Sequence, residues 1–333
     1  MCKMIYLFMC CLLFACCGQK SVTKDAETTS KPEVNKASGM STETLEFNAD
    51  SAYSYVARQV AFGPRVPNSE AHKACAAYLA SELERHGAKL FVQETKLTAY
   101  NGEILSAQNI IGSFDPGKTR RILLFAHWDT RPYADQDEDP ANHYKPIDGA
   151  DDGGSGVGVL LEIARQIGAK RPEIGVDIIF FDAEDYGTPI FSDEYKIDSW
   201  GLGSQFWAKN PHIPNYRAEY GILLDMVGSK GATFYKELTS VRYAGRYVEK
   251  VWTTARLLGY GKYFINATGG AVTDDHTYVI DGRKIPCLDI INYDPENQTG
   301  FGAYWHTLND NMDVISKETL KAVGQTVLHV IFN

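Results

Sequence analysis

Short runs of apolar residues alternate along the chain with longer segments in which apolar residues recur every three or four positions. The short runs are typical of strands buried in an α/β sheet, and they cover residues 121–126 (RILLFA), 176–181 (VDIIFF), 220–224 (YGILL) and 286–291 (PCLDII). The helical spacing is found at residues 69–85, 156–166, 201–209, 243–258 and 316–331. An antiparallel pair of strands is predicted at residues 90–97 and 104–113. Together these elements predict one α/β domain with a mixed, mainly parallel central sheet and helices on both faces.

The first residues follow a different pattern. A single lysine, Lys3, precedes an apolar run over residues 4–14 that is too short to cross a bilayer as a helix, as in a secretory signal peptide. The sequence LFAC at residues 13–16 also fits the bacterial lipobox, in which Cys16 receives lipid after cleavage. The neighbouring Cys17 is an alternative anchor, and an ordinary signal peptide with incidental cysteines is another explanation.

Three regions therefore follow along the chain. Residues 1–15 are predicted to be a lipoprotein signal peptide, residues 16–46 a disordered tether rich in Lys, Thr, Ser and Glu, and residues 47–333 the folded domain. We expect a location in the bacterial cell envelope, at the periplasmic face, with contact to the membrane through the lipid anchor only.

Composition and charge indicate which binding partners the protein is expected to have. The 333 residues are 44% hydrophobic, which is enough for one large core. The net charge is −9 and no block of Lys or Arg is present, so nucleic acid is not an expected partner. Beyond the first 17 residues only Cys75 and Cys287 remain of seven cysteines, and we expect two buried free thiols. We also expect a monomer.

Acids and histidines stand where the predicted strands end. Three strands run into His127, into the sequence DAED at residues 182–185, and into Asp225. Ligands of such sheets gather at the carboxyl ends of parallel strands. Asp152, ahead of a helix, and His306 add to this set. Zinc accepts both imidazole nitrogen and carboxylate oxygen, whereas magnesium and calcium sites seldom use histidine, so the set predicts a zinc site.

Each of these residues also has a structural explanation when taken singly. Asp152 could cap the helix that follows it, Asp225 could bind backbone amides in a turn, and His306 could pack on Trp305. Glu184 and Asp185 could form a solvated acidic turn. Adjacent residues of a regular strand point to opposite faces, so these two acids can reach one cavity only if the backbone bends at the strand end.

Six motifs in a fixed order carry a resemblance to a known family: HWD (127–129), GADDGGSG (149–156), FFDAEDYG (180–187), LLDMVG (223–228), TDDH (273–276) and WHT (305–307). They resemble the zinc aminopeptidase superfamily and, within it, the glutaminyl-peptide cyclotransferases, particularly bacterial enzymes akin to the animal type. The resemblance extends over about residues 50–333 and includes FGPRVPNS at residues 62–69.

The resemblance implies the roles of individual residues. It implies one zinc ion per chain, Zn²⁺, held by Asp152, Asp185 and His306. Glu184 would be the general acid/base, Asp225 and Asp274 accessory acids near the reacting centre, and Trp305 a wall of the substrate pocket.

The implied reaction converts the N-terminal glutaminyl residue of a peptide or protein to pyroglutamate. The α-amine attacks the γ-carbonyl carbon of the side-chain amide, ammonia departs, and Glu184 carries the proton between the two nitrogens. Partners would therefore be peptides and proteins with N-terminal Gln.

A metallo-aminopeptidase is the alternative, because five ligands of such a two-metal centre are also matched: His127, Asp152, Asp185, Asp225 and His306. Three details favour cyclisation. Asp274 stands where the peptidases usually have serine, Trp305 precedes the last histidine, and Asp185 is shorter than the Glu often found there.

Two departures from the family pattern stand out. Asp289 replaces a histidine of the animal-type cyclases, so the hydrogen-bond network behind the pocket must differ, and its role is open. Residues 131–147 and 188–199 form long polar segments, which we predict to be surface loops near the pocket mouth, with their acids on a solvated face.

Overall fold

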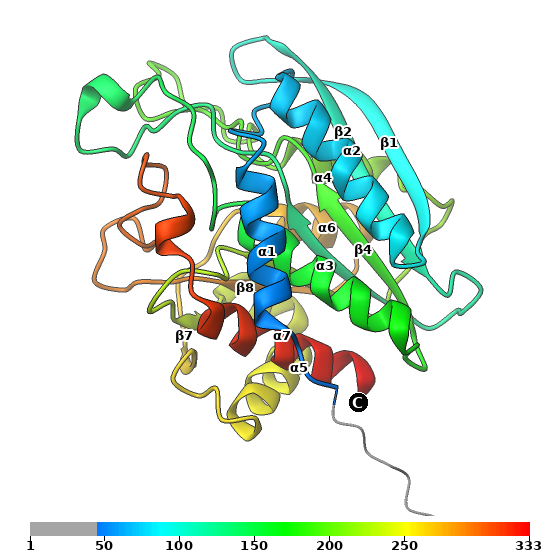
Figure 1. The fold of residues 1–333 in the computed structure, drawn as a ribbon. Helices are drawn as coiled ribbons and strands as arrows, with labels where there is room; N and C mark the ends of the chain where they lie inside the picture. Colours follow the sequence, from blue (N-terminus) through cyan, green and yellow to red (C-terminus); the bar gives the residue numbers. More distant parts are fainter. Residues whose placement is uncertain (1–44) are drawn as a thin grey trace, which may run out of the picture. The chain divides into compact units, whose positions relative to one another are not determined.

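The main sheet has six strands in the order β1-β2-β4-β3-β5-β8 in the computed structural model, which describes residues 45–333 (Figure 1). Strands β4, β3, β5 and β8 are parallel, whereas β2 is antiparallel to both β1 and β4. The six strands are β1 (Lys89–Thr98), β2 (Ile104–Phe114), β3 (Arg121–His127), β4 (Gly175–Phe181), β5 (Gly221–Asp225) and β8 (Cys287–Ile291). A small parallel sheet pairs β6 (Phe234–Lys236) with β7 (Phe264–Thr268).

Helices cover both faces of the main sheet, as expected from the sequence. They are α1 (Ala49–Val60), α2 (Glu70–Arg85), α3 (Gly154–Ala169), α4 (Leu202–Lys209), α5 (Leu238–Leu257), α6 (Asp275–Arg283) and α7 (Lys317–Phe332), with short 3₁₀ helices η1 (Pro140–Asn142) and η2 (Met312–Val314). The expected single α/β domain with a mainly parallel sheet is confirmed.

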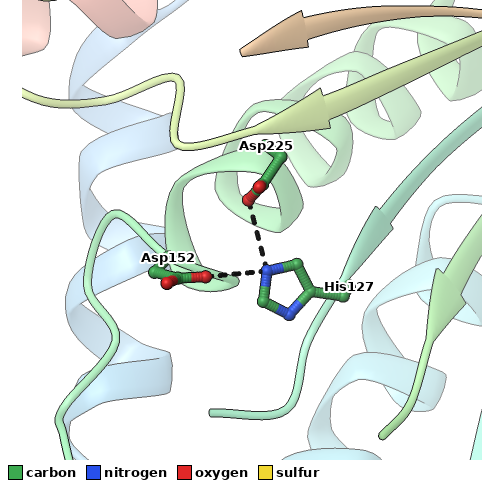
Figure 2. Close-up of side chains that lie close together, drawn as sticks. All are labelled: His127, Asp152 and Asp225. Atoms are coloured by element: carbon green, nitrogen blue, oxygen red, sulfur yellow. Dashed lines mark hydrogen bonds and ion pairs between the residues drawn. The ribbon is translucent and has the colours of Figure 1, made fainter. Parts of the chain in front are cut away.

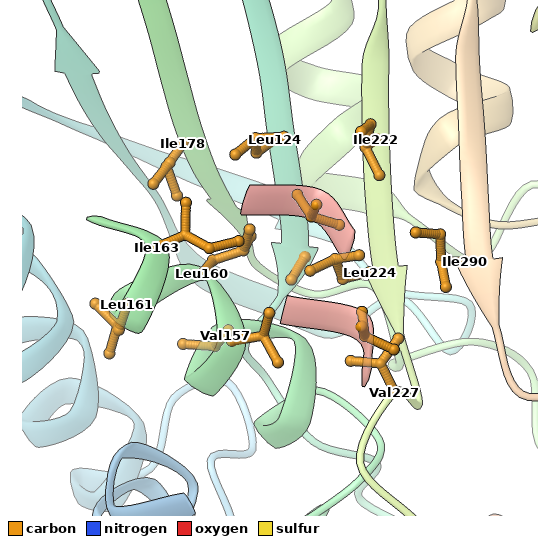
Figure 3. Close-up of a cluster of buried hydrophobic side chains, with 14 of the residues drawn as sticks. Leu124, Val157, Leu160, Leu161, Ile163, Ile178, Ile222, Leu224, Val227 and Ile290 are labelled. Carbon is orange, nitrogen blue, oxygen red and sulfur yellow. The ribbon is translucent and has the colours of Figure 1, made fainter. Parts of the chain in front are cut away.

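Alternation along the strands builds two separate cores. Leu124, Ile222 and Leu224 point to the face covered by α1, α2, α3, α5 and α7, where they meet side chains of α3 such as Val157 and Leu160 (Figure 3). Their neighbours in the strands, including Leu123, Phe125 and Leu223, point to the face covered by α4 and α6. Because helices cover both faces, every residue of β3, β4, β5 and β8 is buried, and most of these residues are apolar.

The ends of the elements follow local capping chemistry. Ser69 and Ser316 accept hydrogen bonds from backbone N–H groups in the first turns of α2 and α7, so both helices begin where the sequence predicts. Helix α5 begins at Leu238, earlier than the expected residue 243, because the Glu237 carboxylate accepts from the N–H groups of Thr239 and Ser240. Helices α1 and α6 and the small sheet were not among the expected elements.

The two long polar segments differ in their burial. In residues 188–199, the side chains of Ile190, Tyr195 and Ile197 are largely exposed, as expected of a surface loop. In residues 131–147, Arg131 and Asp135 are each only 1% exposed. The prediction that the acids of this segment lie on a solvated face is therefore wrong for Asp135, which has an internal cation as its partner.

The expected free thiols are confirmed, since Cys75 and Cys287 are both buried and form no disulfide. Among the described residues, no helix is both long and apolar enough to cross a membrane. The predicted signal peptide, the lipidation residue Cys16 and nearly all of the predicted tether lie outside the described residues.

Candidate active site

A sharp turn after β4 brings the two adjacent acids to one cavity. Ala183 has a φ of 54°, in the left-handed region, and this bends the backbone directly before Glu184. The carboxylate of Asp129 holds the bend, because it accepts hydrogen bonds from the N–H groups of Glu184 (3.0 Å) and Asp185 (3.2 Å). The strand therefore ends in a turn whose two acids face the same space, and the solvated-turn alternative is wrong because both side chains are buried.

Left-handed backbone recurs at two more residues of the site. Met226, directly after Asp225, has a φ of 47°, and His306 has a φ of 54°. Non-glycine residues adopt this conformation at a cost of about 1–3 kcal/mol and cluster at functional sites. The surrounding packing therefore holds these turns in place.

Asp152, Asp185 and His306 converge as the sequence predicts. His306 Nε2 lies 3.2 Å from Asp185 Oδ1 and 3.6 Å from Asp152 Oδ2, and the three residues are at most 3% exposed. Asp152 does not cap α3, which begins at Gly154 after Gly153 without a side-chain hydrogen bond. The capping explanation is thus wrong.

The chemistry of this triad fits a zinc ion. Both carboxylate oxygens of Asp185 and Oδ2 of Asp152 are buried and have no hydrogen-bond partner among the described residues. Buried carboxylates without partners are costly, and a divalent cation between them would neutralise both. One imidazole and two carboxylates are ligands that zinc accepts.

A second triad shares Asp152 with the first. His127, at the end of β3, places Nε2 3.0 Å from Asp152 Oδ1 and 3.2 Å from Asp225 Oδ1 (Figure 2). Both triads have the ligand spacing of a metal site. They differ in that Nε2 of His127 forms a hydrogen bond with Asp225, whereas both oxygens of Asp185 have no hydrogen-bond partner among the described residues.

The triads open onto a cavity of about 300 Å³. Glu184, Asp225, Asp274 and Trp305 line it together with Asp152, Asp185 and His306, so the structure brings together the seven residues of the domain to which the resemblance assigned roles. Trp305 stacks on His306 with ring centroids 3.7 Å apart. His306 therefore does pack on Trp305, as the structural explanation expected. Both residues also face the cavity.

Glu184 has the electrostatic environment of a proton carrier. Burial raises the pKa of Glu184 well above its usual range, the nearby carboxylates of Asp274, Asp275 and Asp185 raise it further, and His127 opposes them. A carboxyl group with a raised pKa can both take and return a proton near neutral pH.

A buried polar cluster lies behind the cavity. Asp289 is fully buried, and its Oδ2 lies 3.8 Å from Nδ1 of His276, whose Nε2 contacts Glu237 at 3.2 Å. Burial and the surrounding acids, Asp274 first among them, raise the pKa of Asp289 well above its usual range. These surroundings favour the uncharged form of the carboxyl group that stands at the position of the animal-type histidine.

Several residues that hold the site were missed in the sequence. Arg65 donates to the carbonyl oxygens of Asp148 (a short contact) and Gly149 (2.7 Å), and Asp310 accepts from the N–H groups of Asp151 (2.8 Å) and Asp152 (3.1 Å). These contacts fix the loop that carries Asp152. Arg65 lies in the FGPRVPNS motif, so the resemblance pointed to it, whereas Asp310 had no local signal.

Residues 109–331 match the profile of peptidase family M28. The chain belongs to this family. Three residues of the triads lie at or directly beyond the carboxyl ends of strands, namely His127 (β3), Asp185 (β4) and Asp225 (β5), whereas Asp152 and His306 belong to loops.

Solved structures that are similar to this chain carry two kinds of name. A solved glutaminyl cyclase of Tannerella forsythia is 76% identical, with a TM-score of 0.86 over 87% of this chain and 99% of that chain. A solved Zn-dependent exopeptidase of Parabacteroides distasonis ATCC 8503 is 71% identical, with a TM-score of 0.87 and the same coverage.

A more distant relative is the glutaminyl-peptide cyclotransferase of Bos taurus, which is 26% identical over 283 residues that cover 77% of this chain and 74% of the relative. The resemblance to the cyclotransferases is confirmed by these similarities.

Proposed function

We propose that the protein converts N-terminal glutaminyl residues of peptides and proteins to pyroglutamate, with release of ammonia. The observation that carries this proposal is the pairing of a buried general acid/base, Glu184, with a ligand triad whose carboxylate oxygens are unsatisfied. The similarity to solved glutaminyl cyclases supports the same activity.

One zinc ion per chain is part of the proposal, with Asp152, Asp185 and His306 as its ligands. Oδ2 of Asp152 and both oxygens of Asp185 support this choice, because they are buried and have no hydrogen-bond partner among the described residues. When bound, zinc supplies a Lewis acid for the carbonyl oxygen of the substrate amide.

Glu184 moves the proton of the reaction. Its carboxylate takes a proton from the substrate's α-amine, the amine nitrogen bonds to the γ-carbonyl carbon, and the carbon–nitrogen bond to the amide NH₂ group breaks. Glu184 then returns the proton to the departing nitrogen, which leaves as ammonia. The raised pKa of Glu184 suits both transfers.

The remaining cavity residues orient the substrate. Nucleophile and electrophile belong to the same residue, so the protein gains most by holding them in ring-closing geometry and by excluding water. Trp305 is proposed to form one wall for the glutaminyl side chain, and Asp225 and Asp274 are proposed to bind its polar atoms, since all three line the cavity.

Hydrolysis is the second candidate, and the arrangement of both triads around Asp152 favours it, because a two-metal aminopeptidase centre needs that set. Release of free glutamine would be its product. One of the similar solved proteins is named a Zn-dependent exopeptidase, so the two activities require a direct test.

The test is to incubate the purified protein with a peptide that begins with Gln and to follow the products by mass spectrometry, with zinc measured in the same preparation. Loss of ammonia from an otherwise intact peptide, at one zinc per chain, supports cyclisation. Release of free glutamine with two metals per chain contradicts it.

The sequence pattern of the first residues supports a cellular setting. We propose that residues 1–15 are removed as a signal peptide, that Cys16 carries a lipid anchor, and that the monomeric domain acts at the periplasmic face of the cell envelope. The exported proteins of the same cell would then be substrates, and nucleic acid would not be a partner. A deletion strain that retains all pyroglutamate on its periplasmic proteins would contradict the choice of substrate.

A further inference from the structure

A buried carboxylate lies behind the proposed zinc ligand His306. Asp135 Oδ1 is 3.3 Å from Nδ1 of His306, on the side of the imidazole opposite to Nε2, which faces Asp152 and Asp185. Asp135 is 1% exposed and His306 is 2% exposed, so water does not compete for this contact. The two ring nitrogens therefore have different partners, a carboxylate on one side and the ligand triad on the other.

Arg131 holds this carboxylate in one orientation. Its Nε donates to Asp135 Oδ1 (2.9 Å) and its Nη2 donates to Asp135 Oδ2 (2.7 Å), which is the bidentate geometry of a strong pair. The N–H group of Ile190 also donates to Asp135 Oδ2 (3.0 Å). With these three donors, Asp135 has little freedom to rotate away from His306.

The same guanidinium also binds the loop of a second ligand. Nη1 of Arg131 donates to the carbonyl oxygens of Asp185 (3.0 Å) and Gly187 (3.2 Å). One side chain thus connects the turn that carries Asp185 with the carboxylate that contacts His306.

An indole completes the arrangement. Trp200 stacks on His306, with ring centroids 5.9 Å apart and planes 12° apart, and the guanidinium of Arg131 lies 4.6 Å from the centre of a Trp200 ring. Gly187 leaves the room for this indole, because a Cβ atom there would lie 2.1 Å from it. Arg131, Trp200 and His306 therefore pack as a stack beside the cavity.

We propose that Asp135, held by Arg131, is a positioning residue that keeps His306 in the tautomer with hydrogen on Nδ1 and the lone pair of Nε2 turned toward the metal. A histidine ligand typically donates its other N–H to a carboxylate or carbonyl oxygen, and loss of such a partner lowers metal affinity about 10–100-fold. This inference rests on the proposed zinc site.

The inference also explains a buried ion pair in a polar segment. Removing the charges of Arg131 and Asp135 from water costs free energy, and this cost can exceed the attraction between the two charges. The ion pair therefore need not stabilise the folded protein. A role in orienting a ligand accounts for the pair, because a carboxylate that accepts from Nδ1 of His306 must keep one orientation, and Arg131 fixes it through two hydrogen bonds.

The experiment measures zinc affinity by competition with a chelator, in the full chain, for Asp135→Asn and for Asp139→Asn. Asp139 belongs to the same segment but is exposed and caps η1, so it is the matched control. We expect the zinc dissociation constant to rise about 10–100-fold for Asp135→Asn and to be unchanged for Asp139→Asn. An unchanged constant in Asp135→Asn overturns the inference.

His306→Ala separates this inference from the ligand assignment. If His306 is a ligand, His306→Ala weakens zinc binding by itself, and adding Asp135→Asn to it has no further effect. A further loss of similar size in the double variant overturns the inference, because Asp135 would then act independently of His306. Unchanged zinc binding in His306→Ala refutes the proposed ligand set, and the inference fails with it.

Arg131→Lys provides a second route should Asp135→Asn not fold. Lysine keeps the charge but cannot bind the carboxylate through two nitrogens. We expect roughly a several-fold rise in the zinc dissociation constant. This rise should be smaller in the His306→Ala background, where only the effect of Arg131 on the turn of Asp185 remains. A rise of equal size in both backgrounds overturns the inference.

Discussion

Gly156, in the first turn of α3, lies so close to Leu224 of β5 that a Cβ atom at residue 156 would be 2.1 Å from the Leu224 carbonyl oxygen. This contact lets the start of α3 approach the carboxyl end of β5. The loop before α3 carries Asp152, and β5 ends at Asp225, so the close approach brings two residues of the site together.

Gly156→Ala is expected to destabilise the protein. The added methyl group meets backbone, which can move only if helix and strand separate, and overpacking of this kind costs about 1–3 kcal/mol in the free energy of unfolding. Urea denaturation measures the change.

Gly245→Ala is the control. Gly245 lies in helix α5, and a Cβ atom there would meet nothing within 4 Å, so alanine is expected to stabilise the protein by up to about 1 kcal/mol. Equal stability of the wild type and Gly156→Ala would show that the close contact between residues 156 and 224 does not affect the free energy of unfolding.

Variants of the neighbouring acids Glu184 and Asp185 are expected to lose turnover for different reasons. Glu184→Gln removes the proton carrier but no proposed ligand, so zinc content should be normal and turnover should fall about 100-fold or more. Asp185→Ala removes a ligand and should lose both zinc and turnover. Zinc analysis and the ammonia-release rate of each variant check this division, and near-normal turnover in zinc-loaded Glu184→Gln would contradict it.

Glu237 is expected to make stability depend on pH in the acid range. Burial alone would raise the pKa of Glu237. Hydrogen bonds from His276 and Ser240 outweigh this effect and lower the pKa to about 2. In the unfolded chain the pKa of a glutamate is about 4.3. The unfolded state therefore binds more protons between about pH 5 and pH 2, and the stabilisation by Glu237, present above that range, is lost as the pH falls through it.

The corresponding measurement compares the wild type with Glu237→Gln, both kept free of metal by a chelator. At pH 7 we expect the variant to be less stable by about 1–3 kcal/mol, because several backbone donors lose a charged acceptor. This difference should shrink as the pH is lowered from about 5 to about 2. A difference that is independent of pH would mean that the carboxylate is not charged in the folded protein.

The sequence by itself determined the layers of the fold and the position of the chemistry. Apolar runs such as residues 121–126 and 176–181 are typical of strands that are buried on both faces, and such strands usually belong to a parallel sheet between layers of helices. Once the strands were known, His127, Glu184 and Asp225 were expected near one another, because the carboxyl ends of parallel strands lie at one edge of the sheet.

Tertiary structure alone decided how these residues are held and which of their neighbours take part. Asp135 and Asp139 are both acids of one polar segment, yet one is buried against Arg131 and His306 and the other is exposed. Asp129 fixes a turn that lies more than fifty residues away along the chain. Local patterns cannot distinguish such cases, because the burial of a charge depends on a partner that only the folded chain brings near.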